Sequence, residues 1–543
     1  MQVKEKYELW LNNVKDETLL NELKSMNEEQ ISTAFFKDME FGTAGLRGTV
    51  GAGSNCMNIY TVGKTTRAVC KYLKNTGGKS IAISYDSRNM SKEFAELVAG
   101  ICAKNGIKSY LVKDMMPTPY LSFMVRYYGT DMGIMITASH NPKAYNGYKV
   151  YGNDGCQLLD EPSLEIMEIA NKLDLFEQEV ESLDAAIEKG LVVYADEEAL
   201  ETYKAEVREQ CEQEIENVTV VYSALNGTGI NTLPDVLMDC GAKIIFNEVQ
   251  CKPDKNFTTC PYPNPEKLEV FETSLPIAKE NNADIIILSD PDADRVGVEV
   301  LHHGEYIHLS GNEVGALLTD YLMKTRPTKD AVIVKSIVST NLAKKIIEHY
   351  GGTCKNVLTG FKYIGEFVTN LEKELEEDRF ILGFEESYGY LIGTHVRDKD
   401  ATVASLVITE MVSEYKKKSK TLIDRLEELY FKFGTFEHKV HSFKFEGSVG
   451  ASKMSEILNG LRDNLPNDIG GLKVLSVQDY EKGVSDLPKA NVLVFELESG
   501  AELIVRPSGT EPLIKVYITL SETKEKNNKN LQKIEKYLQE LMK

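Results

Sequence analysis

The sequence predicts an α/β protein that contains three similar mixed α/β sheet domains and a smaller C-terminal α+β domain. Short apolar runs alternate with helical patterns along most of the chain, and polar turns separate them. After about Gly434 this alternation gives way to successive strands with few long helices between them. The length of 543 residues also exceeds one hydrophobic core and suits about three to five domains of about 100–200 residues.

The first domain begins with charged residues that alternate with Leu, Trp and Phe at helical spacing as far as Lys37. This pattern predicts helices that cover the domain. Helices are then predicted at residues 58–74 and 93–105, and strands at residues 80–85, 109–112 and 133–137. Alternation at this spacing is typical of a mostly parallel sheet with helices on both faces.

Two further units repeat the order of strand, polar turn and helix. An acidic helical stretch at residues 195–217 leads into the second unit. Strands are predicted at residues 218–222 and 284–288 in the second unit, 331–335 in the third, and 438–445, 491–497 and 503–505 in the C-terminal domain. A charged helix at residues 521–543 ends the chain. We interpret the three units as a diverged internal repeat, with domains at residues 1–205, 206–323, 324–434 and 435–543.

The charge of the chain limits its partners. The sequence contains 62 Lys and Arg and 83 Asp and Glu residues, which gives a formal net charge of −21. Such a surface repels nucleic acid and anionic membranes, so an anionic substrate would require basic groups gathered in a cleft. The nine cysteines are scattered without a Cys-x-x-Cys pair, which suits a reducing compartment. The N-terminal residues contain no secretory core and no long apolar stretch is present, so we expect a cytoplasmic protein.

Ser139 is the first candidate catalytic residue. It follows the predicted strand at 133–137, in the turn Ala138-Ser139-His140-Asn141-Pro142. A hydroxyl held on a turn at the end of a strand suits a covalent nucleophile, although a serine that caps the turn is the simpler alternative. A hydrolase elbow fits poorly because its flanking glycines are absent. A protease-like pair with His140 is disfavoured because adjacent side chains seldom form a nucleophile–base hydrogen bond.

Three carboxylates, Asp290, Asp292 and Asp294, alternate in the turn after the predicted strand at 284–288. Hard oxygen donors at this density suit Mg²⁺ or Ca²⁺, and without a cation the three charges repel one another. A calcium-binding hand loop is excluded because Arg295 occupies its glycine position and Leu301 its glutamate position. A solvated acidic turn is the simpler alternative.

Two further strings carry groups suited to a sugar phosphate. Glu385 and Ser387 lie two residues apart at a strand exit, so both can grip neighbouring sugar hydroxyls, although a capping pair is the simpler alternative. Arg506 begins Arg506-Pro507-Ser508-Gly509-Thr510, which combines a guanidinium fork, two hydroxyls and a glycine, the parts of a phosphate cradle or of a plain surface turn. The cluster Arg397-Asp398-Lys399-Asp400 places a lysine among carboxylates, which can shift its pKa.

Five strings, taken together and in order, resemble the motifs of the α-D-phosphohexomutases, the superfamily of phosphoglucomutases and phosphomannomutases. These strings are Gly42-Thr43-Ala44-Gly45-Leu46-Arg47-Gly48, Thr137-Ala138-Ser139-His140-Asn141-Pro142, Asp290-Pro291-Asp292-Ala293-Asp294, Phe384-Glu385-Glu386-Ser387-Tyr388-Gly389 and Arg506-Pro507-Ser508-Gly509-Thr510-Glu511-Pro512. The first and fourth strings are most similar to the phosphoglucomutase-2-like and phosphopentomutase branch. The resemblance spans residues 42–512 and implies four domains around a central cleft.

The resemblance also implies a role for each residue. Ser139 would carry a phosphoryl group and bind Mg²⁺ together with the aspartates of the triad. The catalytic set would comprise Ser139, His140, Arg47, Lys149 and Lys399, with Arg47 facing the phosphoserine and Lys399 a candidate proton donor. The residues expected to contact the substrate are Thr43, Arg295, Thr359, Gly360, Glu385, Ser387, Arg506, Ser508, Gly509 and Thr510.

The implied activity is that of a phosphohexomutase, an isomerase that moves a phosphoryl group within one sugar. We expect interconversion of α-D-glucose 1-phosphate and glucose 6-phosphate through glucose 1,6-bisphosphate, by a monomer or small homo-oligomer whose partner is a small sugar phosphate. Ribose or deoxyribose 1-phosphate is the second candidate substrate and mannose 1-phosphate the third. A sugar-phosphate sensor is the non-enzymatic alternative, and it would need Arg506 and Glu385 but not Ser139, Lys149 or Lys399.

Overall fold

The computed structural model describes residues 2–39, 45–445, 447–484, 487–507 and 513–542. The chain divides into two compact units, of which the first comprises Met1–Gly311 with Phe361–Thr421 and the second Asn312–Gly360 with Leu422–Lys543. This division is coarser than the four domain ranges expected from the sequence, which therefore stay a prediction. No helix in the described part of the chain combines the length and the apolar character needed to cross a membrane.

The first unit opens with three helices, α1 (Val3–Asn13), α2 (Glu17–Ser25) and α3 (Glu28–Phe35), as the sequence predicts. Trp10 is buried and packs edge-on against Phe35, Tyr60 and Phe176, each with its ring centroid 5.6–5.8 Å away. Aromatic pairs in this geometry add to the stabilisation from buried area. The three helices are thereby attached to the first sheet domain through Tyr60 of helix α4 (Ile59–Asn75).

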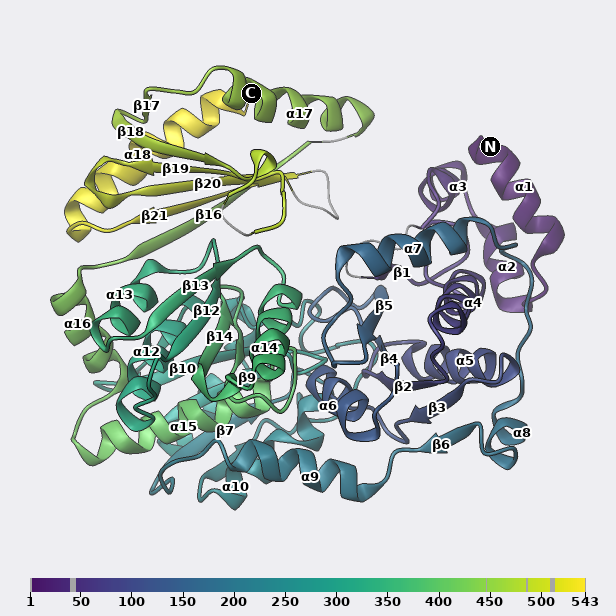
Figure 1. Ribbon diagram of the computed structural model, residues 1–543, viewed down its shortest axis with the longest axis horizontal. Coiled ribbons are helices and arrows are strands. Elements are labelled where there is room, and N and C mark those ends of the chain that lie inside the picture. The colour runs from purple at the N-terminus through teal and green to yellow at the C-terminus, as the bar shows by residue number, and fades with distance from the viewer. Residues whose placement is uncertain (1, 40–44, 446, 485–486, 508–512, 543) are drawn as a thin grey trace. The chain divides into compact units, whose positions relative to one another are not determined.

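The first sheet has six strands in the order β1-β5-β4-β2-β3-β6 (Figure 1). The strands are β1 (Leu46–Thr49), β2 (Ser80–Tyr85), β3 (Lys108–Leu111), β4 (Met132–Ile136), β5 (Tyr145–Gly152) and β6 (Val192–Tyr194). Helices α4, α5 (Ser91–Lys104), α6 (Thr118–Tyr128), α7 (Asp160–Asn171) and α8 (Leu183–Glu188) connect or follow them. The pairs β2–β3, β2–β4 and β3–β6 are parallel, as predicted, whereas β5 is antiparallel to both β4 and β1. Strand β5 has no counterpart among the predicted elements, because the Asn146-Gly147 pair inside it is ordinarily a turn signal.

The second sheet has five strands in the order β11-β10-β9-β7-β8. The strands are β7 (Thr219–Ser223), β8 (Lys243–Phe246), β9 (Ile285–Ser289), β10 (Val296–His302) and β11 (Glu305–Leu309), with helices α9 (Glu197–Arg208), α10 (Leu233–Asp239) and α11 (Leu275–Asn281) and 3-10 turns η1 (Thr228–Asn231) and η2 (Leu268–Phe271). Helix α9 ends at Arg208, before the predicted end at 217. The N–H groups of Glu212 and Gln213 donate instead to the side chain of Glu410, so the chain leaves the helical path.

The rest of the first unit comprises α14 (Lys362–Glu374), η3 (Glu377–Arg379), β14 (Phe380–Glu385), β15 (Gly389–Leu391) and α15 (Ala401–Lys417). Strands β14 and β15 form a tight antiparallel hairpin in which Glu385 pairs with Gly389. The second unit contains α12 (Gly311–Thr325), α13 (Asn341–His349), α16 (Leu422–Phe433) and the parallel strands β12 (Val332–Ser336) and β13 (Thr353–Val357).

The C-terminal part of the second unit is a six-stranded sheet in the order β16-β21-β20-β19-β18-β17 (Figure 1). Its elements are β16 (Glu437–Lys444), α17 (Gly447–Asp463), β17 (Asp468–Ile469), β18 (Leu472–Asp479), η4 (Tyr480–Lys482), β19 (Leu493–Leu497), η5 (Glu498–Gly500), β20 (Glu502–Pro507), β21 (Leu513–Leu520) and α18 (Lys524–Leu541). Alternate residues of β19, β20 and β21 share one core with α17 and α18. The expected α+β character is confirmed, although the sequence analysis did not predict α17.

Gly147 lets strand β5 approach the end of β4. A Cβ atom on Gly147 would overlap the carbonyl oxygen of Thr137 and lie 2.9 Å from that of Leu46. Gly147→Ala should therefore push β5 away from β4 and lower the free energy of unfolding by about 1–3 kcal/mol, as overpacking does. Calorimetry should show a lower melting temperature. Gly460→Ala is the control, since a Cβ there meets nothing within 4 Å in α17, and an equal loss in both variants would contradict the prediction.

Candidate active site

Ser139 lies three residues after the end of β4 in a left-handed backbone conformation, with φ of 51°. This conformation is uncommon for a residue other than glycine. The Ser139 N–H donates to Thr137 Oγ1 at 2.8 Å, and the Thr137 hydroxyl donates to Asp86 Oδ2 at 2.6 Å. Arg88 donates to the Ser139 carbonyl oxygen at 2.5 Å. Buried polar groups on both sides thus hold the backbone of Ser139.

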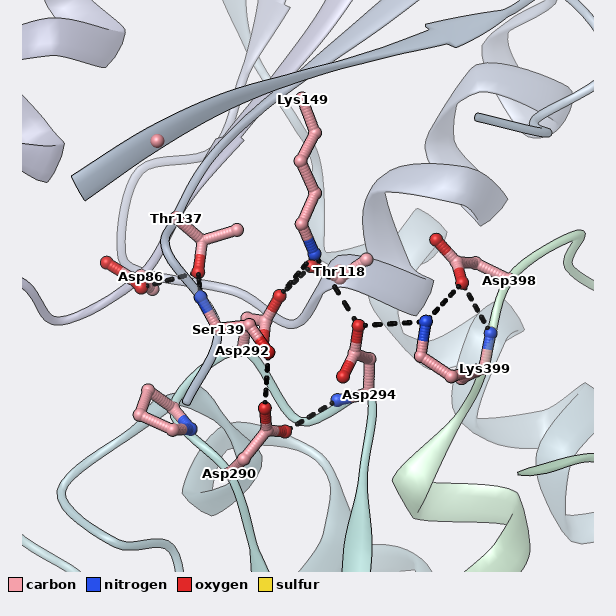
Figure 2. Close-up of polar contacts among 12 residues, drawn as sticks. Asp86, Thr118, Thr137, Ser139, Lys149, Asp290, Asp292, Asp294, Asp398 and Lys399 are labelled. Carbon is pink, nitrogen blue, oxygen red and sulfur yellow. Dashed lines mark hydrogen bonds and ion pairs between the residues drawn. The ribbon is translucent and has the colours of Figure 1, made fainter. Parts of the chain in front are cut away.

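The Ser139 hydroxyl points at the aspartate triad. It donates to Asp290 Oδ2 at 2.8 Å (Figure 2). It also lies 3.1 Å from His140 Nδ1. Burial lowers the pKa of His140 well below its ordinary value, and the guanidinium groups of Arg295 and Arg47 add to the effect. The imidazole next to Ser139 is therefore neutral at neutral pH. The structure brings the predicted nucleophile and the predicted metal-binding loop together.

The three aspartates follow β9 and are almost completely buried. One carboxylate oxygen of each lies within 4.8 Å of the corresponding oxygens of the other two. Burial raises the pKa of Asp290 well above its ordinary value, and the negative charges of Asp292 and Asp294 raise it further. Among the described residues, no hydrogen-bond partner reaches Asp292 Oδ1 or Asp294 Oδ1, although both atoms are buried. Hard oxygen atoms without donors fit a divalent cation such as Mg²⁺.

Two lysines supply positive charge to this loop (Figure 2). Lys149 Nζ lies 2.8 Å from Asp292 Oδ2 and 3.5 Å from Asp294 Oδ2, and Lys399 Nζ lies 3.2 Å from Asp294 Oδ2. Burial opposes both charges, but the aspartates outweigh it and raise the pKa of each lysine. Both ammonium groups therefore keep their protons at neutral pH. Lys149 contacts the aspartate loop to which Ser139 donates, and the expectation that it lies within reach of the Ser139 loop stays a prediction.

The positions of both lysines depend on contacts that are remote in the sequence. Lys149 lies on β5 opposite Met135 of β4. Tyr151, two residues further on the same face of β5, donates to Asp398 Oδ2 at 2.7 Å, and Asp398 Oδ1 lies 3.1 Å from Lys399 Nζ. The side chain of Lys399 runs across Gly389, where a Cβ atom would overlap Lys399 Cδ. Gly389, the last residue of the Phe384–Gly389 string, therefore leaves the space that the Lys399 side chain occupies.

Arg47, Arg295 and Glu385 also lie near this centre. Arg47 of β1 donates to Asn141 Oδ1 at 3.2 Å, so it contacts the Ser139 loop. Arg295 forms an ion pair with Glu266 at 2.6 Å. Glu385 is buried at the end of β14 and contributes to the raised pKa of both Lys399 and Arg295. Ser387 is half-buried in the turn that follows β14.

The remaining predicted site residues lie in the second unit or outside the described residues. Arg506 of β20 donates a hydrogen bond to Thr359 Oγ1, and Gly360 follows Thr359 with φ of 121°. The structure thus joins two strings that are 147 residues apart in the sequence. Thr43, Ser508, Gly509 and Thr510 lie outside the described residues.

Several supporting residues are absent from the predicted set. Asp86 and Arg88 brace the Ser139 loop, and their position directly after a predicted strand could have indicated them. Thr118 donates to Asp292 Oδ2 at 2.7 Å and its N–H to the Asp292 carbonyl at 2.9 Å. Gly227 packs against Pro291, where a Cβ atom would overlap the backbone. No local pattern at Thr118 or Gly227 reveals these contacts, because both depend on the tertiary fold.

Comparison with known proteins places this geometry in a family. Models of the phosphoglucomutase/phosphomannomutase α/β/α domains I, II and III match residues 38–177, 199–303 and 310–430. The fourth, mostly strand domain follows them in the chain. The three matched domains confirm the predicted fold class of three similar α/β domains and a smaller C-terminal one.

Relatives and solved structures agree with these matches. A phosphoglucomutase of Staphylococcus haemolyticus is 38% identical over 504 residues, which cover 90% of this chain and 91% of the relative. The Paramecium phosphoglucomutase parafusin has a TM-score of 0.72 at 18% identity and covers 93% and 95% of the two chains. An Aspergillus fumigatus N-acetylphosphoglucosamine mutase, solved in complex with glucose 1,6-bisphosphate, has a TM-score of 0.51 at 13% identity and covers 98% of both chains. This chain belongs to the phosphoglucomutase/phosphomannomutase family, and it is a mutase.

Proposed function

We propose that this enzyme interconverts α-D-glucose 1-phosphate and glucose 6-phosphate, with Ser139 as the group that carries the phosphoryl. The hydrogen bond from Ser139 Oγ to Asp290 Oδ2, at 2.8 Å, is the observation that carries the proposal. It places a nucleophilic oxygen at a triad suited to a cation, next to the buried ammonium groups of Lys149 and Lys399. Concentrated positive charge near a serine hydroxyl is the requirement of phosphoryl transfer.

The proposed cycle consists of two phosphoryl transfers. In the first, the bond between phosphorus and Ser139 Oγ breaks, a bond to O6 of glucose 1-phosphate forms, and the O6 proton ends on the serine oxygen. The product is glucose 1,6-bisphosphate, which then turns over within the site. In the second, the bond between phosphorus and O1 breaks, a bond to Ser139 Oγ forms, and the serine proton ends on O1. Glucose 6-phosphate leaves and the phosphoserine is restored.

The charged residues around Ser139 divide these tasks. Lys399 keeps its proton because of Asp294, Asp398 and Glu385, so it suits donation of a proton to the sugar oxygen that loses its phosphoryl group. Lys149 adds positive charge at Asp292, and Arg47 adds positive charge at Asn141 of the Ser139 loop. The neutral ring of His140 lies 3.1 Å from Ser139 Oγ, beside the Asp290 oxygen that accepts the serine hydroxyl, and would help to orient the serine oxygen. Each group acts at an atom that gains or loses charge during transfer.

The aspartates of the triad, with the phosphoryl group on Ser139, would hold Mg²⁺. A bound divalent cation supplies charge that offsets the phosphoryl oxygens and the departing serine oxygen. The protein's contribution is the geometry of the site, because Thr118 fixes Asp292 and the N–H groups of Asp294 and Arg295 fix Asp290 Oδ1. Such supporting hydrogen bonds orient carboxylates that bind metal ions.

The sugar and its distal phosphate would contact the remaining predicted residues. Glu385 and Ser387 would grip neighbouring hydroxyls, Arg295 would assist, and Arg506 with Thr359 and Gly360 would bind the distal phosphate. The residues Thr43, Ser508, Gly509 and Thr510 belong to the same proposal through their motifs. The complex of the A. fumigatus mutase with glucose 1,6-bisphosphate supports this bisphosphate as intermediate and activator.

We propose glucose phosphates as first substrates because the relatives of similar length are phosphoglucomutases. The cysteines of the described chain are free, which supports a reducing, cytoplasmic location. The proposed form is a monomer or small homo-oligomer that acts on a small molecule.

Ser139→Ala should abolish turnover of glucose 1-phosphate in an assay primed with catalytic glucose 1,6-bisphosphate. The wild-type protein should carry one phosphate adduct by intact-mass analysis, and the variant should not.

We expect kcat/KM for glucose 1-phosphate to exceed the values for ribose 1-phosphate and mannose 1-phosphate. Undiminished turnover by the variant would exclude Ser139 as the carrier, and a higher value for ribose 1-phosphate would make the enzyme a phosphopentomutase.

Asp292→Asn should remove Mg²⁺ binding measured by calorimetry, because a neutral amide replaces a central carboxylate. Thr118→Val, which removes the hydroxyl that fixes Asp292, should weaken binding by about 10–100-fold. Chelation should stop turnover while circular dichroism stays unchanged. Asp239→Asn, at a surface ion pair with Arg208, is the control and should bind Mg²⁺ as the wild type does. Unfolding upon chelation would point instead to a structural cation.

Gly389→Ala should displace Lys399, whose side chain occupies the space of the new methyl group. We expect kcat/KM to fall by about 10–100-fold, as small displacements of catalytic groups do. The same change in a Lys399→Ala background should add little further loss, because the displaced group is already absent. Additive losses in the double variant would show that Gly389 acts independently of Lys399.

A further inference from the structure

We propose that Arg88, together with Asp86, is a positioning residue that holds Ser139 for phosphoryl transfer. This inference rests on the proposed role of Ser139. It concerns a residue pair outside the catalytic set, and the hydrogen bonds around the Ser139 loop carry it.

The Arg88 guanidinium donates hydrogen bonds to four carbonyl oxygens of the Ser139 loop. Its Nη2 donates to the carbonyls of Ser139 and Asn141, both at 2.5 Å. Its Nη1 donates to the carbonyls of Pro142 and Tyr145 at 3.0 and 3.1 Å. The rigid planar fork of arginine can serve four acceptors in this way, whereas the point charge of lysine cannot.

Asp86 closes the arrangement on the other side of Ser139. Its Oδ2 lies 3.2 Å from Arg88 Nε. The same oxygen accepts the Thr137 hydroxyl, whose oxygen in turn accepts the Ser139 N–H (Figure 2). The side chains of Asp86 and Arg88 are fully buried, and the Arg88 guanidinium lies 5.0 Å from the ring centroid of Phe257. One buried ion pair therefore fixes the carbonyl of Ser139 directly and its N–H through one hydroxyl.

This arrangement accounts for the conformation of Ser139. A left-handed non-glycine residue costs about 1–3 kcal/mol and persists only where its surroundings determine it. The peptide bonds are trans, so the N–H of His140 points opposite to the Ser139 carbonyl, away from Arg88. Within the described chain this N–H forms no hydrogen bond. It is therefore available to an anionic oxygen on the other side of the loop from Arg88.

The burial of the pair also explains why it positions Ser139 and does not bind substrate. Every Arg88 contact of the described structure is to the protein backbone, to Asp86 or to Phe257. A sugar phosphate would have to displace these partners to reach it. The pair therefore acts on the reaction through the placement of Ser139 Oγ relative to Asp290.

The test compares Arg88→Lys, Thr137→Val and a matched control, Arg67→Lys, in the full-length phosphorylated enzyme. Arg67 is a buried arginine, with 9% of its side chain exposed, that binds Glu177 and the Asp174 carbonyl, on helix α4 and outside the site. Arg88→Lys and Thr137→Val should each lower kcat about 10–100-fold with little change in KM, since the substrate contacts remain. Hydrogen exchange of residues 138–146 should accelerate in both, and the Ser139 phosphate should hydrolyse faster by intact mass. Arg67→Lys should change none of the three.

If a folded Arg88→Lys protein has the same kcat as the wild type and the same rate of hydrogen exchange in the loop, the proposal is overturned. Equal losses in Arg88→Lys and Arg67→Lys that track their melting temperatures would overturn it as well, because they indicate general destabilisation. If Arg88→Lys does not fold, Thr137→Val decides alone, since valine matches threonine in shape and removes only the link between Asp86 and Ser139. A wild-type protein without mutase turnover would contradict the proposed function, while loop exchange would still decide the role of Arg88.

Discussion

The structure of the site depends on one electrostatic constraint, the burial of three carboxylates within 4.8 Å of one another. Three like charges in a low-dielectric interior repel strongly unless cations or hydrogen-bond donors compensate them. The protein supplies Lys149 and Lys399, the backbone N–H groups that follow Asp290, and the Thr118 hydroxyl. Two carboxylate oxygens still have no hydrogen-bond donor among the described residues, and a divalent cation would meet that remaining need.

This constraint also explains why a strongly acidic protein can act on anionic sugar phosphates. The net charge of −21 repels such molecules at long range. Around Ser139, however, Arg47, Lys149 and Lys399 bring positive charge from three separate segments. Salt in solution screens the distant surface charge more effectively than these partly buried groups. The local field at the serine oxygen is therefore set by the site and not by the overall charge.

The sequence predicted the parts of the site that are local strings and missed those that depend on tertiary contacts. Ser139 and the aspartate triad each follow an apolar strand, so their chemistry and placement could be inferred together. Strand β5 was not predicted because it contains an Asn-Gly pair, although it carries Lys149. Thr118 acts on Asp292, 174 residues away, which no periodicity can indicate. Helix α17 was likewise missed, since alternating strands dominate the sequence around it.

The three turns of the first unit that carry candidate site residues share one backbone feature. Ser139 follows β4, Ala293 follows β9 and Tyr388 follows β14, and each has a positive φ of 51°, 50° or 69°. Such a residue reverses the chain sharply at the end of a strand, at a cost of about 1–3 kcal/mol for each turn. Neighbouring strands offset that cost, since Asp86 follows β2 beside β4 and Gly227 follows β7 beside β9. An antiparallel strand follows each of these turns, β5 after β4, β10 after β9 and β15 after β14. The turns of Ser139 and Ala293 each lie next to a strand end that braces them, and this pairing brings polar groups from distant segments together around Ser139.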